Sequence, residues 1–392
     1  FKAAGGMNSD SRKFRSGRYV QQSAGYRAFI PEKLPPHPPI QIDEELQFLL
    51  SKADRALGRL DGSIQTLPHP DLFVAMYIRK EAVLSSQIEG TQSSLRDVLA
   101  AEARILSPTR PDDVGEVLNY VNAMNYGLER LVTLPVSIRL IREIHERLLS
   151  GVRGREQSPG ELRRTQNWIG PAGCTLGEAS FVPPPSHELS RLLGDLEHFL
   201  HSEEPIPLLV RIGLAHAQFE TIHPFLDGNG RIGRLLITLL LCRSDVLQKP
   251  VLYLSHFFKQ HRQEYYDCLQ AIRDEGDWER WMRFFLEGIF EVSQQAAETA
   301  RQILLLRERH RQIITESCGR AASNGHRVLD FLFELPIVSV REVQDLTGSS
   351  YQAANNLVAQ FVQQGVLHEM QDNDETGAFC ILSTYGYSMT DQ

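Results

Sequence analysis

Residues 223–234 read His-Pro-Phe-Leu-Asp-Gly-Asn-Gly-Arg-Ile-Gly-Arg and separate two helical patterns, so they fix a helix–loop–helix near the middle of the chain. The flanking patterns cover residues 206–222 and 230–244, where apolar side chains recur with helical period. Gly228 and Gly230 permit the positive φ angles that curl backbone amides toward an anion. Because amides at a helix N-terminus are unpaired and lie at the positive end of the helix dipole, this loop is predicted to bind an anion.

The polar side chains of this segment supply the parts of a nucleotide-transfer site. His223 is the side chain best suited to accept a proton near neutral pH. Asp227 is a hard oxygen ligand for Mg²⁺, which typically takes one carboxylate and completes its shell from phosphates and water. Arg231 and Arg234 leave one helix face and can hold phosphate oxygens. No Lys-Ser/Thr pair follows the glycines, so the segment is not a Walker loop, and we interpret it as a nucleotide-using transferase site.

In this order the residues match every defined position of the signature HPFx[D/E]GNGRxxR, and the chain resembles the Fic family over most of residues 20–290. The resemblance implies a mainly α Fic fold and transfer of AMP from ATP to a Ser, Thr or Tyr hydroxyl of a protein. It implies that His223 is the general base and that Asp227 holds Mg²⁺ between the α- and β-phosphates. The residues implied in ATP and phosphate binding are Gly228, Asn229, Gly230, Arg231, Gly233, Arg234 and Tyr266. Asn229 would stabilise charge on the α-phosphate, and Tyr266 either lies against the adenine or only packs.

An inhibitory element is indicated at the end of the helix predicted over residues 71–89. Glu89 falls in its last turn, where a negative charge opposes the helix dipole unless an arginine pairs with it. Ser85, Glu89 and Gly90 match the family's inhibitory pattern [S/T]xxxE[G/N]. The resemblance implies that Glu89 pairs with Arg234 and blocks placement of the γ-phosphate. The alternative is an ordinary surface glutamate.

Short β-like runs between residues 158 and 186 predict a hairpin. It resembles the family's flap, which implies that an extended target segment docks there by β-augmentation. A hairpin without that role is the alternative. The residues assigned to target docking are Trp168, Ile169, Gly170, Phe181 and Val182.

The chain divides into four predicted regions. Residues 1–40, polar and then proline-rich, are expected as an extended arm over the surface. Residues 41–135 are expected as a helical region that carries the inhibitory helix, and residues 136–310 as the Fic catalytic core. Residues 320–392 follow the order helix, helix, helix, hairpin, which predicts a winged-helix-like domain.

The C-terminal region is poorly equipped to bind DNA. Residues 320–392 contain three basic and nine acidic side chains, and its third predicted helix, residues 349–364, has no Lys or Arg. Because DNA binding needs several cations that neutralise phosphates, we expect a protein-interaction or dimerisation role there instead. A homodimer is implied only by the resemblance.

The cysteines and the apolar segments of the chain indicate its cellular location. Its five cysteines are scattered and form no C-x-x-C pair, which favours a reducing cytoplasm. The apolar segment at residues 237–242 is far too short to span a membrane.

The sequence is compatible with three functions. The first is protein adenylylation of targets and of the chain itself, restrained by Glu89. The second keeps the site but moves another phosphate-containing group or removes AMP. The third is a transcriptional regulator with a vestigial core, which the complete set of site residues and the acidic tail both disfavour.

Overall fold

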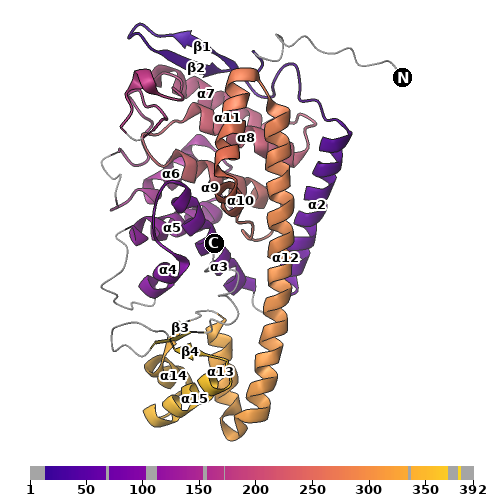
Figure 1. Ribbon diagram of the computed structural model, residues 1–392, viewed down its shortest axis with the longest axis vertical. Coiled ribbons are helices and arrows are strands. Elements are labelled where there is room, and N and C mark those ends of the chain that lie inside the picture. Colours follow the sequence, from indigo (N-terminus) through magenta and orange to yellow (C-terminus); the bar gives the residue numbers. More distant parts are fainter. Residues whose placement is uncertain are drawn as a thin grey trace.

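The computed structural model describes residues 14–67, 70–102, 113–152, 157–171, 173–333, 337–369 and 378–380. Figure 1 shows a helical body at one end, a small unit at the other, and the long helix α12 joining them. The mainly α fold expected from the sequence is confirmed. Within the described ranges no helix is both long and apolar enough to cross a membrane.

Two buried helices, α8 (Leu208–Ile222) and α9 (Asn229–Arg243), form the centre of the body. Both are buried on nearly all faces, which is typical of a helix surrounded by others. They lie at the positions predicted from the flanking patterns of the central motif. The surrounding helices are α2 (Glu44–Gln65), α3 (Pro70–Ile88), α4 (Leu95–Glu102), α5 (Val114–Arg130), α6 (Ile138–Leu148), α7 (Leu189–His201), α10 (Ser255–Gln260) and α11 (Arg262–Glu275).

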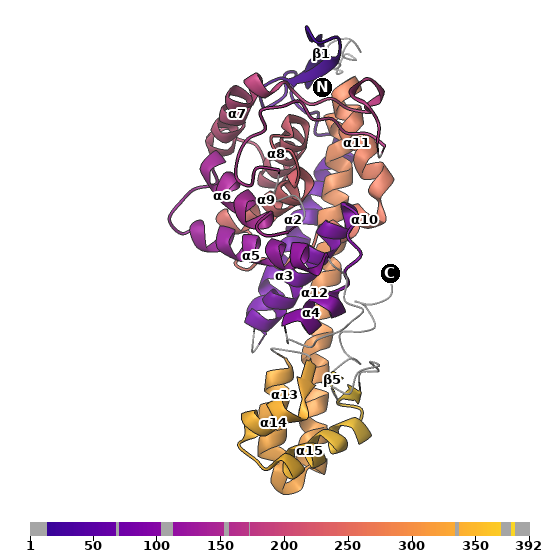
Figure 2. The ribbon, with the colours of Figure 1, turned by 90° about the vertical axis from the view of Figure 1, so that its left-hand side faces the viewer.

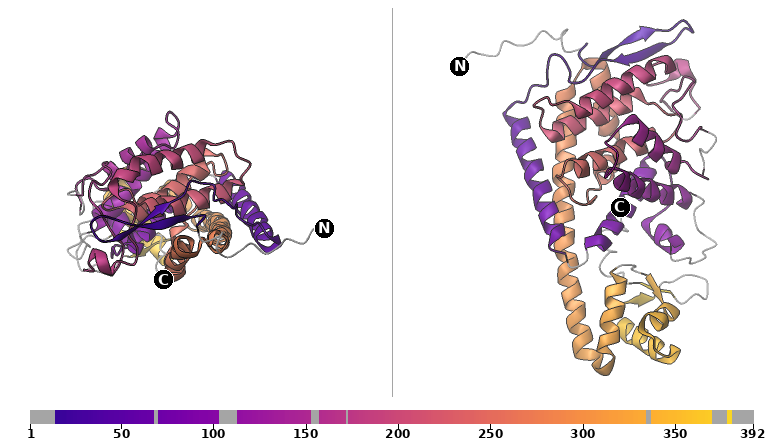
Figure 3. Two further views of the ribbon diagram at one scale, coloured as in Figure 1. Left: turned by 90° about the horizontal axis from the view of Figure 1, so that it is seen from above. Right: turned by 180° about the vertical axis from the view of Figure 1, so that it is seen from behind.

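Helix α12 (Trp278–Ser317) is 40 residues long and runs beside α2, as Figure 3 shows from behind. Asp277 caps its start by accepting a hydrogen bond from the Arg280 N–H. Near this end the buried Trp281 ring donates its Nε1–H to the Gly213 carbonyl of α8, at 2.9 Å. The helix therefore anchors the body at its start, and it continues past residue 310, the predicted end of the Fic catalytic core.

The C-terminal unit stands apart from the body along α12 (Figure 2). Its strands pair antiparallel in the order β3-β5-β4. This order of helices and strands agrees with the predicted winged helix, and that assignment stays a prediction. Residues 370–377 and 381–392, with several of the acidic side chains counted above, lie outside the described residues. The elements are η3 (Gly319–Ala321), α13 (Ala322–Leu332), β3 (Ile337–Ser339), α14 (Val340–Thr347), α15 (Tyr351–Gln363), β4 (His368–Glu369) and β5 (Ala378–Cys380).

The N-terminal segment corrects one expectation. In place of an extended arm, β1 (Gly17–Gln21) and β2 (Arg27–Pro31) pair as an antiparallel hairpin. Gly25 takes a φ of 89° in the connecting turn, a conformation that favours glycine. The Phe29 N–H donates to the Val182 carbonyl oxygen at 2.9 Å, so the hairpin is joined to the segment predicted as the flap. Residues 1–13 of the predicted arm lie outside the described residues.

Candidate functional site

His223 ends α8 in a left-handed conformation, with φ 49° and ψ 60°. Such a conformation is costly for a residue other than glycine and is retained where the surroundings hold it. Arg163 provides that hold, since its Nε–H donates to the His223 carbonyl at 2.9 Å and its backbone N–H to the Pro224 carbonyl at 3.0 Å. Arg163 lies within residues 158–186, where the flap hairpin was predicted, and the sequence assigned this side chain no individual role.

The His223 ring is suited to act as a base at neutral pH. Burial, together with the positive charges of Arg163 and Arg273, lowers its pKa to about 4. Its Nδ1 lies 3.4 Å from the Glu220 carbonyl oxygen. Because a carbonyl can only accept, Nδ1 carries the ring proton and Nε2 is the nitrogen left to take one.

Asn229 closes the loop between the two helices. Its Oδ1 accepts from the Phe225 N–H at 2.9 Å, and its Nδ2 donates to the Phe225 carbonyl at 2.8 Å. The side chain that the resemblance assigned to the α-phosphate is thus engaged within the loop. Its backbone amide belongs to the first turn of α9, where an anion is favoured.

His145 supports the same loop from α6. Its ring stacks on Phe225 with centroids 3.7 Å apart. Nδ1 accepts from the Gly160 N–H at 2.9 Å, so Nε2 carries the proton and donates to the Asp227 carbonyl at 3.0 Å. Nothing near His145 in the sequence indicates this contact, since 82 positions separate it from Asp227.

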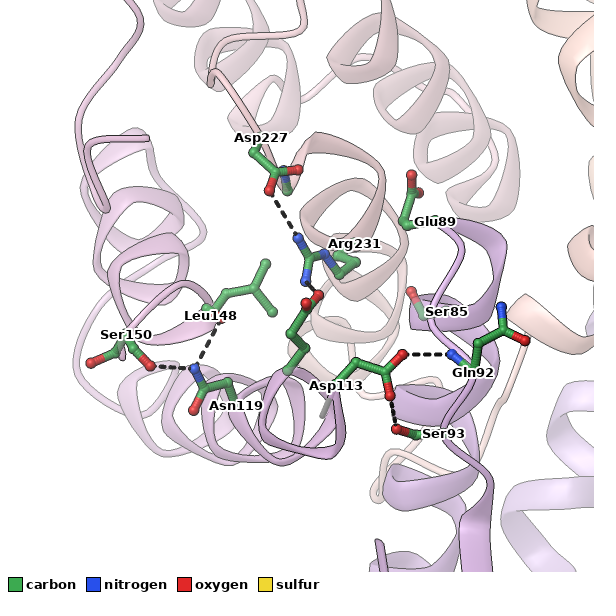
Figure 4. A network of polar contacts seen from close by, with 12 residues as sticks. Ser85, Glu89, Gln92, Ser93, Asp113, Asn119, Leu148, Ser150, Asp227 and Arg231 are labelled. Carbon is green, nitrogen blue, oxygen red and sulfur yellow. Dashed lines mark hydrogen bonds and ion pairs between the residues drawn. The ribbon is translucent and has the colours of Figure 1, made fainter. Parts of the chain in front are cut away.

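Arg231 and Asp227 lie together at the entrance to α9, as Figure 4 shows. Arg231 is buried, with Nη1 3.1 Å from Glu116 Oε2 and Nη2 3.4 Å from Asp227 Oδ2. The Asp227 side chain is 46% exposed, and its Oδ1 accepts from the Gly228 N–H at 2.6 Å. Glu116, from α5, is a partner that sequence reasoning missed.

Asp227 fits a magnesium ion that arrives with phosphates. Within the described residues, no group of three or more His, Cys, Asp or Glu side chains is arranged to hold a metal. One accessible carboxylate is what Mg²⁺ typically takes from a protein when phosphates and water complete its shell. The role of Asp227 as a metal ligand stays a prediction.

The predicted pairing of Glu89 with Arg234 is present. Arg234 Nη2 donates to Glu89 Oε1 at 2.6 Å, and the buried guanidinium also binds Ser85 through Oγ at 2.8 Å and the carbonyl oxygen at 3.0 Å. Burial alone would raise the pKa of Glu89, but the attraction of Arg234 outweighs it and the pKa is lowered. Helix α3 ends at Ile88, so Glu89 lies just beyond its last turn and not within it as predicted, and Gly90 follows with a φ of 101°.

The Glu89 carboxylate lies over the start of α9. A side chain at Gly230 would collide with Glu89 Oε1, and Gly233, one turn further along, faces Glu220 in the same way. These two glycines of the motif therefore admit two carboxylates to the surface of the helix. Burial raises the pKa of Glu220 to about 7, and no sequence pattern indicated its presence there.

The predicted flap hairpin reduces to one antiparallel bridge. Ile169 and Phe181 exchange backbone hydrogen bonds of 2.9 and 3.0 Å. Trp168 is 42% exposed, whereas Phe181 and Val182 are buried and the Arg273 guanidinium lies 3.7 Å from the Phe181 ring centroid. Of these side chains Trp168 faces outward, and target docking stays a prediction.

Tyr266 lies beside the Glu89–Arg234 pair. Its pKa is raised, first by burial and then by the charge of Glu89, and its ring is 37% exposed. The neighbouring Tyr265 is buried and hydrogen-bonded to His216 Nε2 at 2.9 Å. The position of Tyr266 is compatible with a nucleotide base against the ring, and contact with adenine stays a prediction.

Buried imidazoles near the site predict an acid-sensitive fold. Burial lowers the pKa of His145 to about 4 and that of His216 to about 3. In the unfolded chain both groups titrate near pH 6.5, so below that pH the unfolded state binds protons that the folded state does not. The free energy of unfolding should therefore fall as the pH drops below about 6.5, by about 1.4 kcal/mol per pH unit for each group.

Urea unfolding between pH 7 and pH 5 measures this loss. His145→Gln should reduce the slope of unfolding free energy against pH. His187→Gln is the matched control, because the His187 side chain is 72% exposed, and it should leave the slope unchanged. Equal slopes for His145→Gln and the unmodified chain would contradict the assignment.

Comparison with known proteins identifies two adjacent family models. The model described as Fic/DOC family N-terminal matches residues 48–129, and that described as Fic/DOC family matches residues 135–241. A "Protein adenylyltransferase Fic" from Drosophila grimshawi is 34% identical over 200 residues, which are 50% of this chain and 37% of the relative. One from Drosophila yakuba is 32% identical over 259 residues, 63% of this chain and 46% of the relative. The chain thus spans between a third and a half of the length of these curated relatives.

A solved structure supports the same fold. The crystal structure of a Fic family protein from Desulfovibrio desulfuricans G20 superposes with a TM-score of 0.58. The match covers 87% of this chain and 97% of the other at 20% sequence identity. At that identity the likeness shows the fold alone.

Proposed function

We propose that this chain, which matches the two Fic/DOC family models over residues 48–129 and 135–241, transfers AMP from ATP to hydroxyl groups of proteins, itself included. The observation that carries the proposal is the convergence at the start of α9 of a neutral histidine, an accessible carboxylate and two buried arginines. Proton acceptor, metal ligand and phosphate-binding cations are the groups that such a transfer requires.

Each residue has a defined part in the proposed reaction. The target hydroxyl loses its proton to His223 Nε2 while its oxygen forms a bond to the α-phosphorus. The bond between the α-phosphorus and the bridging oxygen breaks, and pyrophosphate leaves. Arg234 and the amides of α9 bind phosphate oxygens and hold the α-phosphorus in line. Asp227 would hold the Mg²⁺ that accompanies ATP, and this ion supplies neutralisation of phosphate charge.

Glu89 restrains this reaction in the proposal. Its carboxylate lies on Gly230 and takes the Nη2 of Arg234, so it covers the anion-binding start of α9 and one of its cations. A phosphate group in that position would meet a negative charge and compete for the same guanidinium. Release of Glu89 is therefore a condition for productive binding of ATP.

The wider setting belongs to the proposal. The acceptor is a hydroxyl-bearing protein segment laid along the flap near Trp168, and the cofactor is Mg²⁺ brought with ATP. We propose a cytoplasmic location from the cysteine pattern and a homodimer from the family resemblance alone.

Isotope-labelled ATP tests the reaction. The protein with Glu89→Gly is incubated with Mg²⁺ and ATP labelled at either the α- or the γ-phosphate, and the intact mass and protein-bound label are measured. We expect transfer of the α-label with release of pyrophosphate, and no transfer when Mg²⁺ is chelated. Transfer of the γ-label would show a kinase instead, and loss of AMP from a pre-modified protein would show the reverse reaction.

A further inference from the structure

Asp113 occupies the N-cap position of α5 but its side chain caps a different segment. An aspartate at this position ordinarily accepts hydrogen bonds from the first turn of its own helix. Here the side chain makes no capping bond to α5. Its Oδ2 accepts from the Gln92 N–H at 2.6 Å and its Oδ1 accepts from the Ser93 hydroxyl. Figure 4 shows these two bonds, which join the start of α5 to the segment after α3.

The residues that Asp113 holds belong to the turn that carries Glu89. The Glu89 N–H donates to the Ser86 carbonyl at 3.0 Å and the Gly90 N–H to the Gln87 carbonyl at 3.1 Å, so the turn is closed onto the end of α3. The Gln92 side chain also donates to the Gly90 carbonyl at 3.1 Å. These bonds join residues 86–92 into one unit, and a carboxylate fixed at one side of it constrains the other.

Helix α5 also binds Arg231, on the α9 side of the site. Glu116 lies one turn after Asp113 and binds the buried guanidinium of Arg231 at 3.1 Å. One turn further, the Tyr120 hydroxyl donates to Glu81 Oε1 at 3.3 Å, which ties α5 to the body of α3. Helix α5 therefore sets the position of the Glu89 turn relative to α9.

We propose that Asp113 is a positioning residue of the inhibitory turn, holding residues 92–93 so that Glu89 reaches Arg234. The inference rests on the proposed function for its effect on activity. Loss of the carboxylate removes two hydrogen bonds to a charged group while leaving Glu89 and the catalytic loop intact. The turn then leaves Arg234 more often, and AMP transfer accelerates.

Self-modification rates in Mg²⁺-ATP, followed by intact mass, test the proposal. Asp113→Ala should react on the order of tenfold faster than the unmodified chain, the size expected when hydrogen bonds to a charged group are lost. Ser93→Ala, which removes one of the two bonds, should change the rate in the same direction by less. In a Glu89→Gly background Asp113→Ala should add nothing, because the group it positions is gone.

Asn119→Ala is the matched control. Asn119 lies on α5 and donates to the carbonyls of Leu148 at 3.2 Å and Ser150 at 2.6 Å, away from the Glu89 turn. It should react at the unmodified rate. An unchanged rate for Asp113→Ala, or an equal gain in the Glu89→Gly background, would overturn the proposal.

Hydrogen exchange separates this inference from the proposed function. Amides of residues 89–93 should exchange faster in Asp113→Ala than in Asn119→Ala, and this does not depend on any reaction. If Glu89→Gly yields no AMP adduct, adenylylation has failed and the exchange data alone decide the role of Asp113. Equal exchange in the two variants would then overturn it.

Discussion

Glu89→Gly is expected to raise the rate of AMP transfer by on the order of 100-fold, the upper range for loss of a charge-assisted hydrogen bond. Three effects act in the same direction. The Arg234 guanidinium loses a carboxylate 2.6 Å away and becomes available to a phosphate. The space over Gly230 opens, and the negative charge that repels an incoming anion is removed.

The experiment compares initial rates of self-modification with the unmodified chain at a single ATP concentration, and then ATP affinity by calorimetry. Affinity should rise together with the rate, since the pair blocks binding and not the proton transfer. Glu102→Gly is the matched control, because it breaks another arginine–glutamate pair that involves α3, between Arg79 of α3 and Glu102 of α4 at 2.6 Å, outside the site. A comparable gain from Glu102→Gly would point to general loosening of α3 and against autoinhibition.

The central motif could be predicted from the sequence because its functional residues are contiguous. Twelve successive residues contain the proposed base, the carboxylate, the glycines and both arginines, and helical periodicity on each side sets where the loop must fall. The Glu89–Arg234 pair was also foreseen, although 145 positions separate its members, because the family pattern names both. In both cases a pattern identified each residue separately.

The residues that hold the site in place were not foreseen. Arg163, His145 and Glu116 contact the loop or Arg231 from segments between 60 and 115 positions away, and nothing local distinguishes them from surface side chains. The position of Asp113 before a helix predicts that its side chain caps α5. The side chain binds residues 92 and 93 instead. The contacts of Glu116 and His145 depend on how α5 and α6 pack against α9, and the contact of Arg163 depends on the path of the segment after α6. Helical periodicity alone determines neither.

The N-terminal hairpin was missed for a different reason. Its strands are short, and the proline-rich residues that follow them favour the prediction of an extended arm. Tyr19, Phe29 and Ile30 on either side of Gly25 are the signal that a β-turn was present. The hairpin affects the site because the Phe29 N–H of β2 binds the Val182 carbonyl oxygen. The side of the flap near Trp168 is therefore the exposed one.

His223→Ala, placed in the Glu89→Gly background, is expected to lower the rate of AMP transfer by about 10² to 10⁴, the usual contribution of a general base. ATP affinity should stay unchanged, because the arginines and the α9 amides that are proposed to bind phosphate are untouched. This separation of chemistry from binding distinguishes loss of the base from collapse of the loop, which would weaken both. A variant that lost affinity in proportion to its rate would argue for a structural role of His223.

The pH dependence of the Glu89→Gly rate gives a second, independent test of the base. Burial lowers the pKa of His223 to about 4, so the ring is unprotonated throughout the neutral range. A base acts only when unprotonated, and the rate should therefore fall as the pH drops through about 4 and stay level in this limb from about pH 5 to pH 8. An exposed histidine would instead place the half-maximal rate near pH 6.5. A midpoint near 6.5 that disappears in His223→Ala would confirm the base but show that its ring is solvated when the reaction occurs, because burial is what separates the two values.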